Sequence, residues 1–422
     1  MLTGVKTEPS AEASAKLRGE PSPEAWAAFH HQFRDCFARR ESWAQLFRYW
    51  RERCGKGVRT EGSVADPKGA GSDRARQRFL SDAAWDEEKL LARFHGQVRV
   101  ALGDREAALV FLEAGFAKKG EESAGTERQS YDSSGRVRNG QVGIFAVYVS
   151  RHGAIPVAAR LYVPDVWCGE DRRVKRDKCR FPADFGYRTK TAIILEMLAQ
   201  IREAGMLPFR YILVAGLPES ARGLIQAAGA PPGFTYFLPA PRDMAVWITK
   251  EAVWKRRARH WWVWHYRQKY VRIVKRIPAP LYTWAYARRI RDCFWHRPPG
   301  SGAEVEQGGG EFTHKRVTVS IGAGPKKIIW LFARRTKGKK PAYTCHISNA
   351  PPPVRLATFV RLSASGEAAR RSLQEAKDVS GLGRYAVRTY PGWHHHVLAC
   401  MLAHFLLAHG LQDPDESQPP MR

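Results

Sequence analysis

The sequence lacks the patterns that identify several large classes of protein. Its seven cysteines are an odd number and include no Cys-x-x-Cys pair, which argues against a disulfide framework and against a zinc ribbon. The longest apolar run, residues 397–408, contains His404 and is too short to cross a bilayer. No charged-then-apolar leader is seen at the N-terminus. We therefore expect a soluble protein of the reducing cytoplasm with no membrane partner.

Common catalytic signatures are missing as well. The sequence has no Gly-x-Ser-x-Gly elbow, no phosphate-cradling Gly-x-x-x-x-Gly-Lys-Ser/Thr loop and no His-Glu-x-x-His motif. Acidic residues are scarce: 41 Asp and Glu stand against 69 Lys and Arg, which gives a net charge of +28 and a pI near 10.1. This balance favours a polyanion such as nucleic acid, although ribosomal-type solubility or attraction to membranes would produce it too.

The first quarter of the chain is expected to be mostly helical. Residues 1–23 are rich in Ser, Pro, Glu and Ala without periodicity, so we interpret them as a disordered N-terminus. Aromatic residues at helical spacing over 24–50 and a second periodic stretch over 73–100 predict amphipathic helices. Gly, Asp and Lys over 55–72 predict a flexible connection between them.

A buried strand organises the next part of the chain. The stretch 109–120, LVFLEAGFAKKG, is an apolar run that we expect to stop at a turn at Gly115 and Phe116 and to end in a basic loop. Because strand side chains alternate between faces, Leu112 and Glu113 are expected to point to opposite sides.

Further strands and a helix follow this first strand. Alternating runs at 141–149 and 154–162, separated by Arg-His-Gly, predict a β-hairpin. A helix over 189–204 and a buried strand over 210–214 come next. Strand, hairpin, helix and strand form the opening order of an RNase H-like α/β domain, which is the fold class that we predict.

The second half of the chain changes character. Residues 247–299 interleave Lys and Arg with Trp and Tyr, which offers phosphate neutralisation and stacking, although such tryptophans also pack between domains. Strand patterns return at 316–321 and 326–333, and helical spacing over 373–407 closes the chain. Because consecutive helical residues face different directions, we interpret the triplet His394 to His396 as structural and expect no bound metal.

Several blocks of the sequence resemble a known family. Residues 103–120, GDREAALVFLEAGFAKKG, are similar to the first catalytic block of transposases of the insertion sequence 701 type. The later matching blocks follow in the same order: Arg128-Gln129, Gly135, Val137, Asn139 and Gln141 to Gly143; Leu161 to Trp167; Thr189-Lys190; Trp330 and Ser348-Asn349; and Ala376 to His404. The resemblance covers roughly residues 24–408.

The resemblance implies a DDE transposase of the insertion sequence 4 superfamily with an RNase H-like core. In this family three carboxylates hold two magnesium ions, which activate water or a 3′-hydroxyl for attack on a phosphodiester. The segments that we expect are 1–23, a disordered N-terminus; 24–103, a helical DNA-binding region; 104–225, the first part of the RNase H-like core; 226–365, an insertion that is basic and Trp-rich and then β-rich; 366–410, C-terminal helices that complete the core; and 411–422, a tail.

The matching positions lack these carboxylates. The first falls on Leu112, whose neighbour Glu113 matches a second, non-ligand acid of the family. The second falls on Ala215 or Gly216, and the third falls on Arg370. A guanidinium cannot coordinate a cation and repels it. We therefore expect no catalytic residue, no metal site and no cofactor at these positions.

Two interpretations of the substitutions stay open. Arg370 has the charge to replace the missing cation beside a DNA phosphate, so that binding is kept while cleavage is lost; the alternative is decay of the gene. A rival hypothesis is an active, magnesium-dependent transposase that uses the shifted acids Glu113, Glu219 and Glu367.

The leading hypothesis is a catalytically inactive, transposase-derived protein that binds double-stranded DNA as a repressor, targeting factor or recruited subunit. We expect it to be associated with the nucleoid, and a homodimer is one option. A scaffold for another protein or for RNA is a third hypothesis. The predicted DNA contacts are all basic: Lys118, Lys119, Arg128, Lys255, Arg256, Arg257, Arg259, Arg267, Lys269, Arg272, Lys275, Arg276, Arg370 and Lys377.

Overall fold

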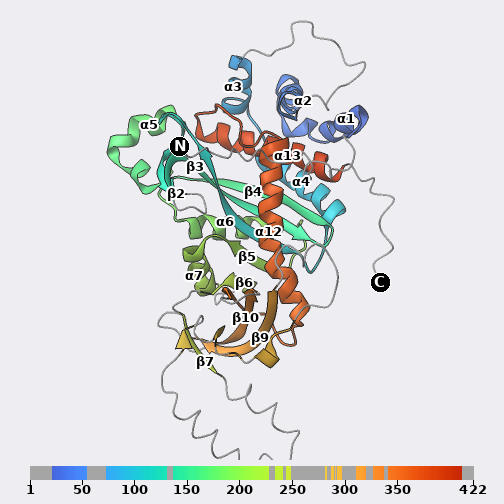
Figure 1. Cartoon of the computed structure of the whole chain (residues 1–422). Coiled ribbons are helices and arrows are strands. Elements are labelled where there is room, and N and C mark those ends of the chain that lie inside the picture. Colours follow the sequence, from blue (N-terminus) through green and yellow to red (C-terminus); the bar gives the residue numbers. More distant parts are fainter. Residues whose placement is uncertain are drawn as a thin grey trace, which may run out of the picture.

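A computed structural model gives the structure of the chain (Figure 1). The residues that it describes are 21–54, 73–130, 136–227, 233–240, 244–248, 281–282, 287–288, 290, 292–296, 310–319, 327–336 and 341–410. Four regions discussed above lie outside the described residues: most of the predicted disordered N-terminus, the connection over 55–72, the basic and Trp-rich stretch over 249–280 and the tail over 411–422.

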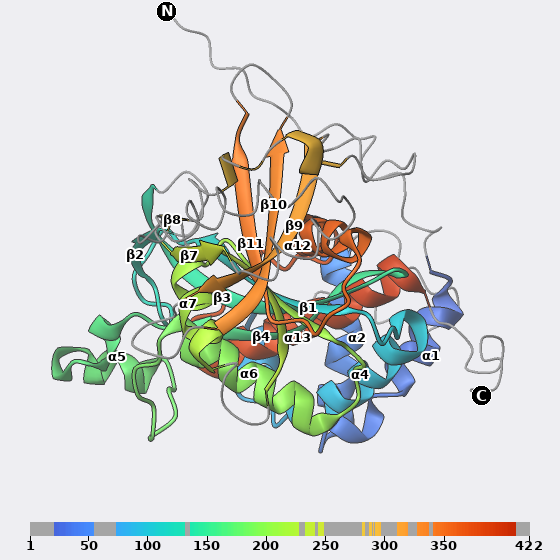
Figure 2. The same ribbon diagram turned by 90° about the horizontal axis from the view of Figure 1, so that it is seen from below.

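A mixed β-sheet forms the centre of the molecule (Figures 1 and 2). β1 (Ala108–Ala117) pairs antiparallel with β3 (Val137–Ser150) on one side and parallel with β5 (Tyr211–Ala215) on the other. β4 (Gly153–Tyr162) pairs with β3, and β6 (Thr235–Pro239) pairs parallel with β5. In the order β4-β3-β1-β5-β6, the parallel register brings Leu112, in the middle of β1, beside Ala215 at the C-terminal end of β5.

The remaining strands extend this sheet at both edges. β11 pairs with β6, the sheet continues through β10, β9, β7 and β8, and β2 pairs with β3. Their bounds are β2 (Glu127–Ser130), β7 (Ala245–Ile248), β8 (Leu281–Tyr282), β9 (Gly310–Val319), β10 (Lys327–Thr336) and β11 (Tyr343–Ser348). β6 falls in the segment that was expected to be an insertion, yet it is the direct neighbour of β5 in the central sheet.

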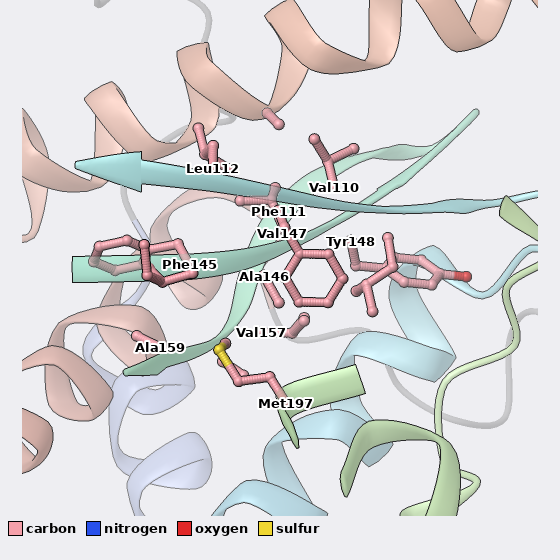
Figure 3. Packing of buried hydrophobic residues seen from close by; sticks show 14 of the residues in the cluster. Val110, Phe111, Leu112, Phe145, Ala146, Val147, Tyr148, Val157, Ala159 and Met197 are labelled. Atoms are coloured by element: carbon pink, nitrogen blue, oxygen red, sulfur yellow. The ribbon is translucent and has the colours of Figure 1, made fainter. Parts of the chain in front are cut away.

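Helices pack on both faces of the sheet (Figure 1). Figure 3 shows Leu112 and Phe111 of β1 pointing to opposite sides, with Met197 of α6 on the Phe111 side. No helix of the described ranges is long and apolar enough to cross a membrane. The helices are α1 (Pro23–His31), α2 (Arg40–Cys54), α3 (Asp73–Ser81), α4 (Glu87–Leu102), α5 (Arg173–Lys178), α6 (Lys190–Ala204), α7 (Pro218–Ala227), α12 (Leu356–Val379) and α13 (Tyr390–His409), with short 3-10 turns at Arg34–Cys36, Asp165–Cys168, Glu170–Arg172 and Asp292–Phe294.

Local sequence signals explain where several of these helices begin and end. The Thr189 hydroxyl accepts a hydrogen bond from the backbone N–H of Ala192 at 3.1 Å and caps α6. Gly205 ends the same helix at φ +63°, a left-handed conformation that glycine adopts without steric cost. The predicted helices over 24–50, 73–100 and 189–204 and the predicted hairpin are confirmed in outline.

One detail of the prediction is wrong. The turn expected at Gly115 and Phe116 does not form, because both residues stay in β1 and pair with Val142 and Gln141 of β3. The helical spacing predicted over 373–407 is found in α12 and α13, and α12 already starts at Leu356. Small residues in the first half of α12 conceal its periodicity, although Phe359 and Leu362 are fully buried there.

α13 is the most completely buried helix of the described chain. It packs against β4 and α12, and also against α2, α3 and α4 of the N-terminal helical region. Trp50 of α2 donates a hydrogen bond from its indole N–H to the carbonyl oxygen of Ala399 at 2.9 Å. Phe29 of α1 stacks on Phe405. The N-terminal helices and the sheet therefore share one hydrophobic core.

The three consecutive histidines of α13 each contact a different part of the molecule. His394 Nε2 lies 3.4 Å from the backbone N–H of Leu161 in β4. His395 Nδ1 lies 2.6 Å from the carbonyl oxygen of Leu80. His396 Nδ1 accepts from the Tyr49 hydroxyl at 2.6 Å, and its Nε2 donates to the Leu382 carbonyl oxygen at 3.0 Å. These contacts give the triplet the structural role expected from the sequence.

This burial predicts a pH-dependent stability. Burial lowers the pKa of His396 to about 3, well below its ordinary value. The unfolded chain takes up a proton near pH 6.5 and the folded chain does not, so stability is fully present above pH 6.5 and falls as the pH drops toward 3. Each such histidine should lower the free energy of unfolding by about 1.4 kcal/mol per pH unit in this window.

Urea denaturation of the wild type, His396→Gln and His152→Gln at pH 7.5 and 5.5 checks this expectation. His396→Gln should reduce the change in the free energy of unfolding between the two pH values by the contribution of one histidine. His152 is exposed and serves as the matched control, so His152→Gln should show the same change as the wild type. Equal pH dependence in all three proteins would contradict the assignment.

Candidate functional site

The positions that match the first two family carboxylates lie next to each other in the sheet. Leu112 of β1 and Ala215 of β5 are paired in the parallel register, so their side chains point to the same face. Leu112 is 3% exposed and packs into the core (Figure 3). Ala215 is the last residue of β5 and is only partly buried.

The third position approaches from α12. A Cβ atom added to Gly366 would lie 3.6 Å from the Cβ of Ala215, which places this turn of α12 over the end of β5. One turn further along, Arg370 Nη2 lies 3.8 Å from the position of a Cβ on Gly216. Gly216 is exposed and has φ +80°, so another residue would be strained there. The structure thus brings Leu112, Ala215, Gly216 and Arg370 together.

The donor set at this convergence does not suit a divalent cation. Magnesium takes oxygen ligands. Leu112 and Ala215 instead supply apolar side chains, Gly216 has no side chain, and Arg370 supplies a guanidinium. Arg370 is half exposed and forms a surface ion pair with Glu367 on its own helix at 3.4 Å. Among the residues that the structure describes, no three His, Cys, Asp or Glu side chains are grouped to hold a metal ion.

Glu113 lies on the other face of β1. Its carboxylate is 2.5 Å from Lys190 Nζ at the start of α6, and this pair is largely buried. The Lys190 ammonium also sits 5.1 Å from the centre of the Tyr162 ring. The alternation of Leu112 and Glu113 that was expected from the sequence is confirmed. Glu113 therefore points away from α12, which carries Glu367, and the Glu219 side chain lies outside the described residues.

Two of the lysines predicted to contact phosphates, Lys118 and Lys377, are packed against aromatic rings. Lys118 Nζ lies 3.6 Å from the centre of the Tyr385 ring and donates to the Tyr385 carbonyl oxygen at 3.3 Å. Burial lowers the pKa of Lys118 to about 8. Lys377 Nζ donates to the Gly115 carbonyl oxygen at 3.2 Å, and burial lowers the pKa of its ammonium too. Both ammonium groups thus already have partners within the chain.

The other predicted contacts fall into two groups. Lys119 follows β1 and Arg128 lies on β2, and both side chains are exposed. The contacts predicted from Lys255 to Arg276 lie outside the described residues.

A polar network beside the site was missed from the sequence. The Tyr385 hydroxyl donates to Gln141 Oε1 at 2.8 Å and accepts from the Trp393 indole N–H at 3.1 Å. Gln141 Nε2 donates to the Ala124 carbonyl oxygen at 2.6 Å. Gln141, Tyr385 and Trp393 all belong to blocks of the family resemblance, which was the available signal, but their partners are far apart in the sequence.

Comparison with known proteins gives one family match. A family model described as DDE superfamily endonuclease matches residues 32–260, just over half of the chain. None of the curated proteins that were compared matches the chain.

The Glu113–Lys190 pair gives a testable prediction about stability. Glu113→Gln leaves a buried ammonium without its counter-charge, so we expect the free energy of unfolding to fall by about 2 kcal/mol. Urea denaturation of Glu113→Gln, Lys190→Met and the double variant measures the coupling energy. The exposed pair of Glu367 and Arg370 provides the control, since Glu367→Gln should cost under about 0.5 kcal/mol. Additive effects of Glu113→Gln and Lys190→Met would contradict a direct interaction.

Proposed function

The chain belongs to the DDE superfamily of endonucleases, and from this premise we propose that it is a transposase-derived protein that binds double-stranded DNA without cutting it. The proposal places the chain with transposases of the insertion sequence 701 type and gives it an RNase H-like core. The strand order β4-β3-β1-β5-β6, with β1 parallel to β5 and antiparallel to β3, supports that core.

One observation carries the proposal that cleavage is lost. The backbone brings the middle of β1, the end of β5 and α12 together at one place, but the side chains that meet there are Leu112, Ala215 and Arg370. Metal-assisted phosphodiester cleavage needs carboxylate oxygens at such a place. Glu113, the nearest acid in β1, is directed to the opposite face and neutralised by Lys190. The centre therefore keeps its scaffold without the ligands for magnesium.

Charge supports the proposal that DNA binding is retained. The net charge of +28 favours a polyanionic partner. Arg370 brings a permanent positive charge to the place where the family holds a divalent cation, and its half-exposed guanidinium has donors suited to a phosphate. A DNA phosphate that no longer meets a metal ion would there meet an arginine.

A combined cleavage and binding experiment tests the proposed function. We expect no nicking of supercoiled plasmid above background in magnesium or manganese, because the centre lacks oxygen ligands. We also expect a gel shift of duplex DNA that EDTA leaves unchanged. Magnesium-dependent nicking that disappears in Glu113→Gln would establish the rival, an active nuclease with shifted acids. Copurified nucleic acid sensitive to RNase alone would favour an RNA scaffold.

The role of Arg370 is tested separately by the salt dependence of DNA binding. Arg370→Gln should weaken binding by about threefold to tenfold at low salt and reduce the slope of log K against log salt by about one. Arg355→Gln serves as a control, since it removes the same charge from the exposed residue that precedes α12. An unchanged slope in Arg370→Gln would remove Arg370 from the DNA contacts.

A further inference from the structure

β2 and β3 form a short ribbon beside the end of β1. Arg128 pairs with Asn139, and Ser130 pairs with Val137, in the antiparallel register. Directly opposed residues of neighbouring strands project to the same face, and so do residues two positions apart. Arg128, Ser130, Val137 and Asn139 therefore share one face, which we call the ribbon face.

Asn139 fastens the ribbon face to the basic loop after β1. Its side-chain amide donates to the carbonyl oxygens of Lys118 at 3.0 Å and Gly120 at 3.1 Å. The Asn139 carbonyl oxygen in turn accepts from the Lys118 backbone N–H at 3.1 Å. One residue thus holds the backbone on both sides of Lys119, which limits the freedom of the loop.

The two adjacent lysines of this loop have different environments. The Lys118 side chain turns inward to the Tyr385 ring, whereas Lys119 is exposed. Within the described part of the chain, the Lys119 ammonium and the Arg128 guanidinium have no hydrogen bond or ion pair. Asn139 lies opposite Arg128 and donates hydrogen bonds to the loop that carries Lys119, so this loop is held at the edge of the ribbon face.

Two nearby glutamates, Glu127 and Glu122, form ion pairs with other basic residues. Glu127 faces the other side of the ribbon, where it pairs with Arg172 at 3.6 Å. Glu122 pairs with Lys175 at 3.7 Å, next to α5. In Figures 1 and 2, β2 and α5 lie on the same side of the molecule. Glu121 follows Gly120 and is exposed, and its negative charge offsets part of the positive charge of Lys119.

We propose that Lys119 and Arg128 hold the backbone phosphates of one strand of bound duplex DNA as it crosses the ribbon face, with Asn139 as the positioning residue. This rests on the proposed function, since it names the residues that would contact the backbone of the bound DNA. A lysine ammonium is a compact charge on a flexible stem, and an arginine presents a planar fork of donors. Fixing the loop backbone reduces the conformational entropy that Lys119 loses when it contacts a phosphate.

The salt dependence of duplex binding tests the two phosphate contacts. Lys119→Gln and Arg128→Gln should each reduce the slope of log K against log salt by about one, and the double variant by about two. Arg355→Gln is the matched control, because Arg355 is exposed and precedes α12, outside both the ribbon and the predicted DNA-binding helices. Glu121→Gln should raise affinity, since it removes a charge that repels phosphate. If the wild type binds duplex DNA and both slopes equal that of Arg355→Gln, this proposal fails and the proposed function stands.

A double-mutant cycle tests Asn139. Asn139→Ala removes both amide donors, so Lys119→Gln should cause a smaller loss of affinity in that background than in the wild type. Thermal unfolding of each variant separates this coupling from a loss of folding, and Asn139→Asp, which keeps the size of the side chain, repeats the test. An undiminished effect of Lys119→Gln in both backgrounds would remove the positioning role. If the wild type binds no duplex DNA, the proposed function falls first and this proposal falls with it.

Discussion

The close approach of Trp393 to Gly143 is the constraint on which the rest of the structure depends. A Cβ atom on Gly143 would lie 2.9 Å from Cζ2 of the Trp393 ring, so only glycine lets α13 pack this closely on β3. The fully buried Trp393 indole donates its N–H to the Tyr385 hydroxyl, which in turn donates to Gln141. Gln141 then donates to the Ala124 carbonyl oxygen in the segment between β1 and β2. This contact therefore joins the sheet and the segment between β1 and β2 to α13, the helix that also packs against α2, α3 and α4.

The fold was predictable to the extent that it follows from local pattern. The hairpin of β3 and β4, the helix from Lys190 and the strand from Tyr211 all have clear periodicity and end signals, and they form as expected. The continuation of β1 through Gly115 was not predictable in the same way. Gly-Phe is a turn signal in isolation, but fourteen residues of β3 offer a long antiparallel partner that keeps those residues extended. Long-range pairing decided this point, and a single sequence does not display it.

The candidate site was also predictable only in part. The resemblance identified Leu112, Ala215, Gly216 and Arg370 by position, and the fold brings these four together. The environment of each lysine depended on contacts that no spacing reveals. The Lys118 ammonium lies over the ring of Tyr385, more than 250 positions later in the chain, whereas its neighbour Lys119 is exposed. Adjacent residues of the same type thus differ in environment because only one of them reaches a ring that the fold brings from far along the chain.

The proposed replacement of carboxylates by an apolar side chain and a guanidinium would also have a consequence for folding. Three acids gathered at one place repel one another without a metal ion, and their desolvation opposes folding. Leu112 is instead buried in the core, and Arg370 keeps its charge partly in water beside Glu367. Neither side chain needs a cation to be stable in its place. A protein that binds DNA without a metal ion, as we propose, would therefore depend on no second ligand for its stability or for the charge of Arg370.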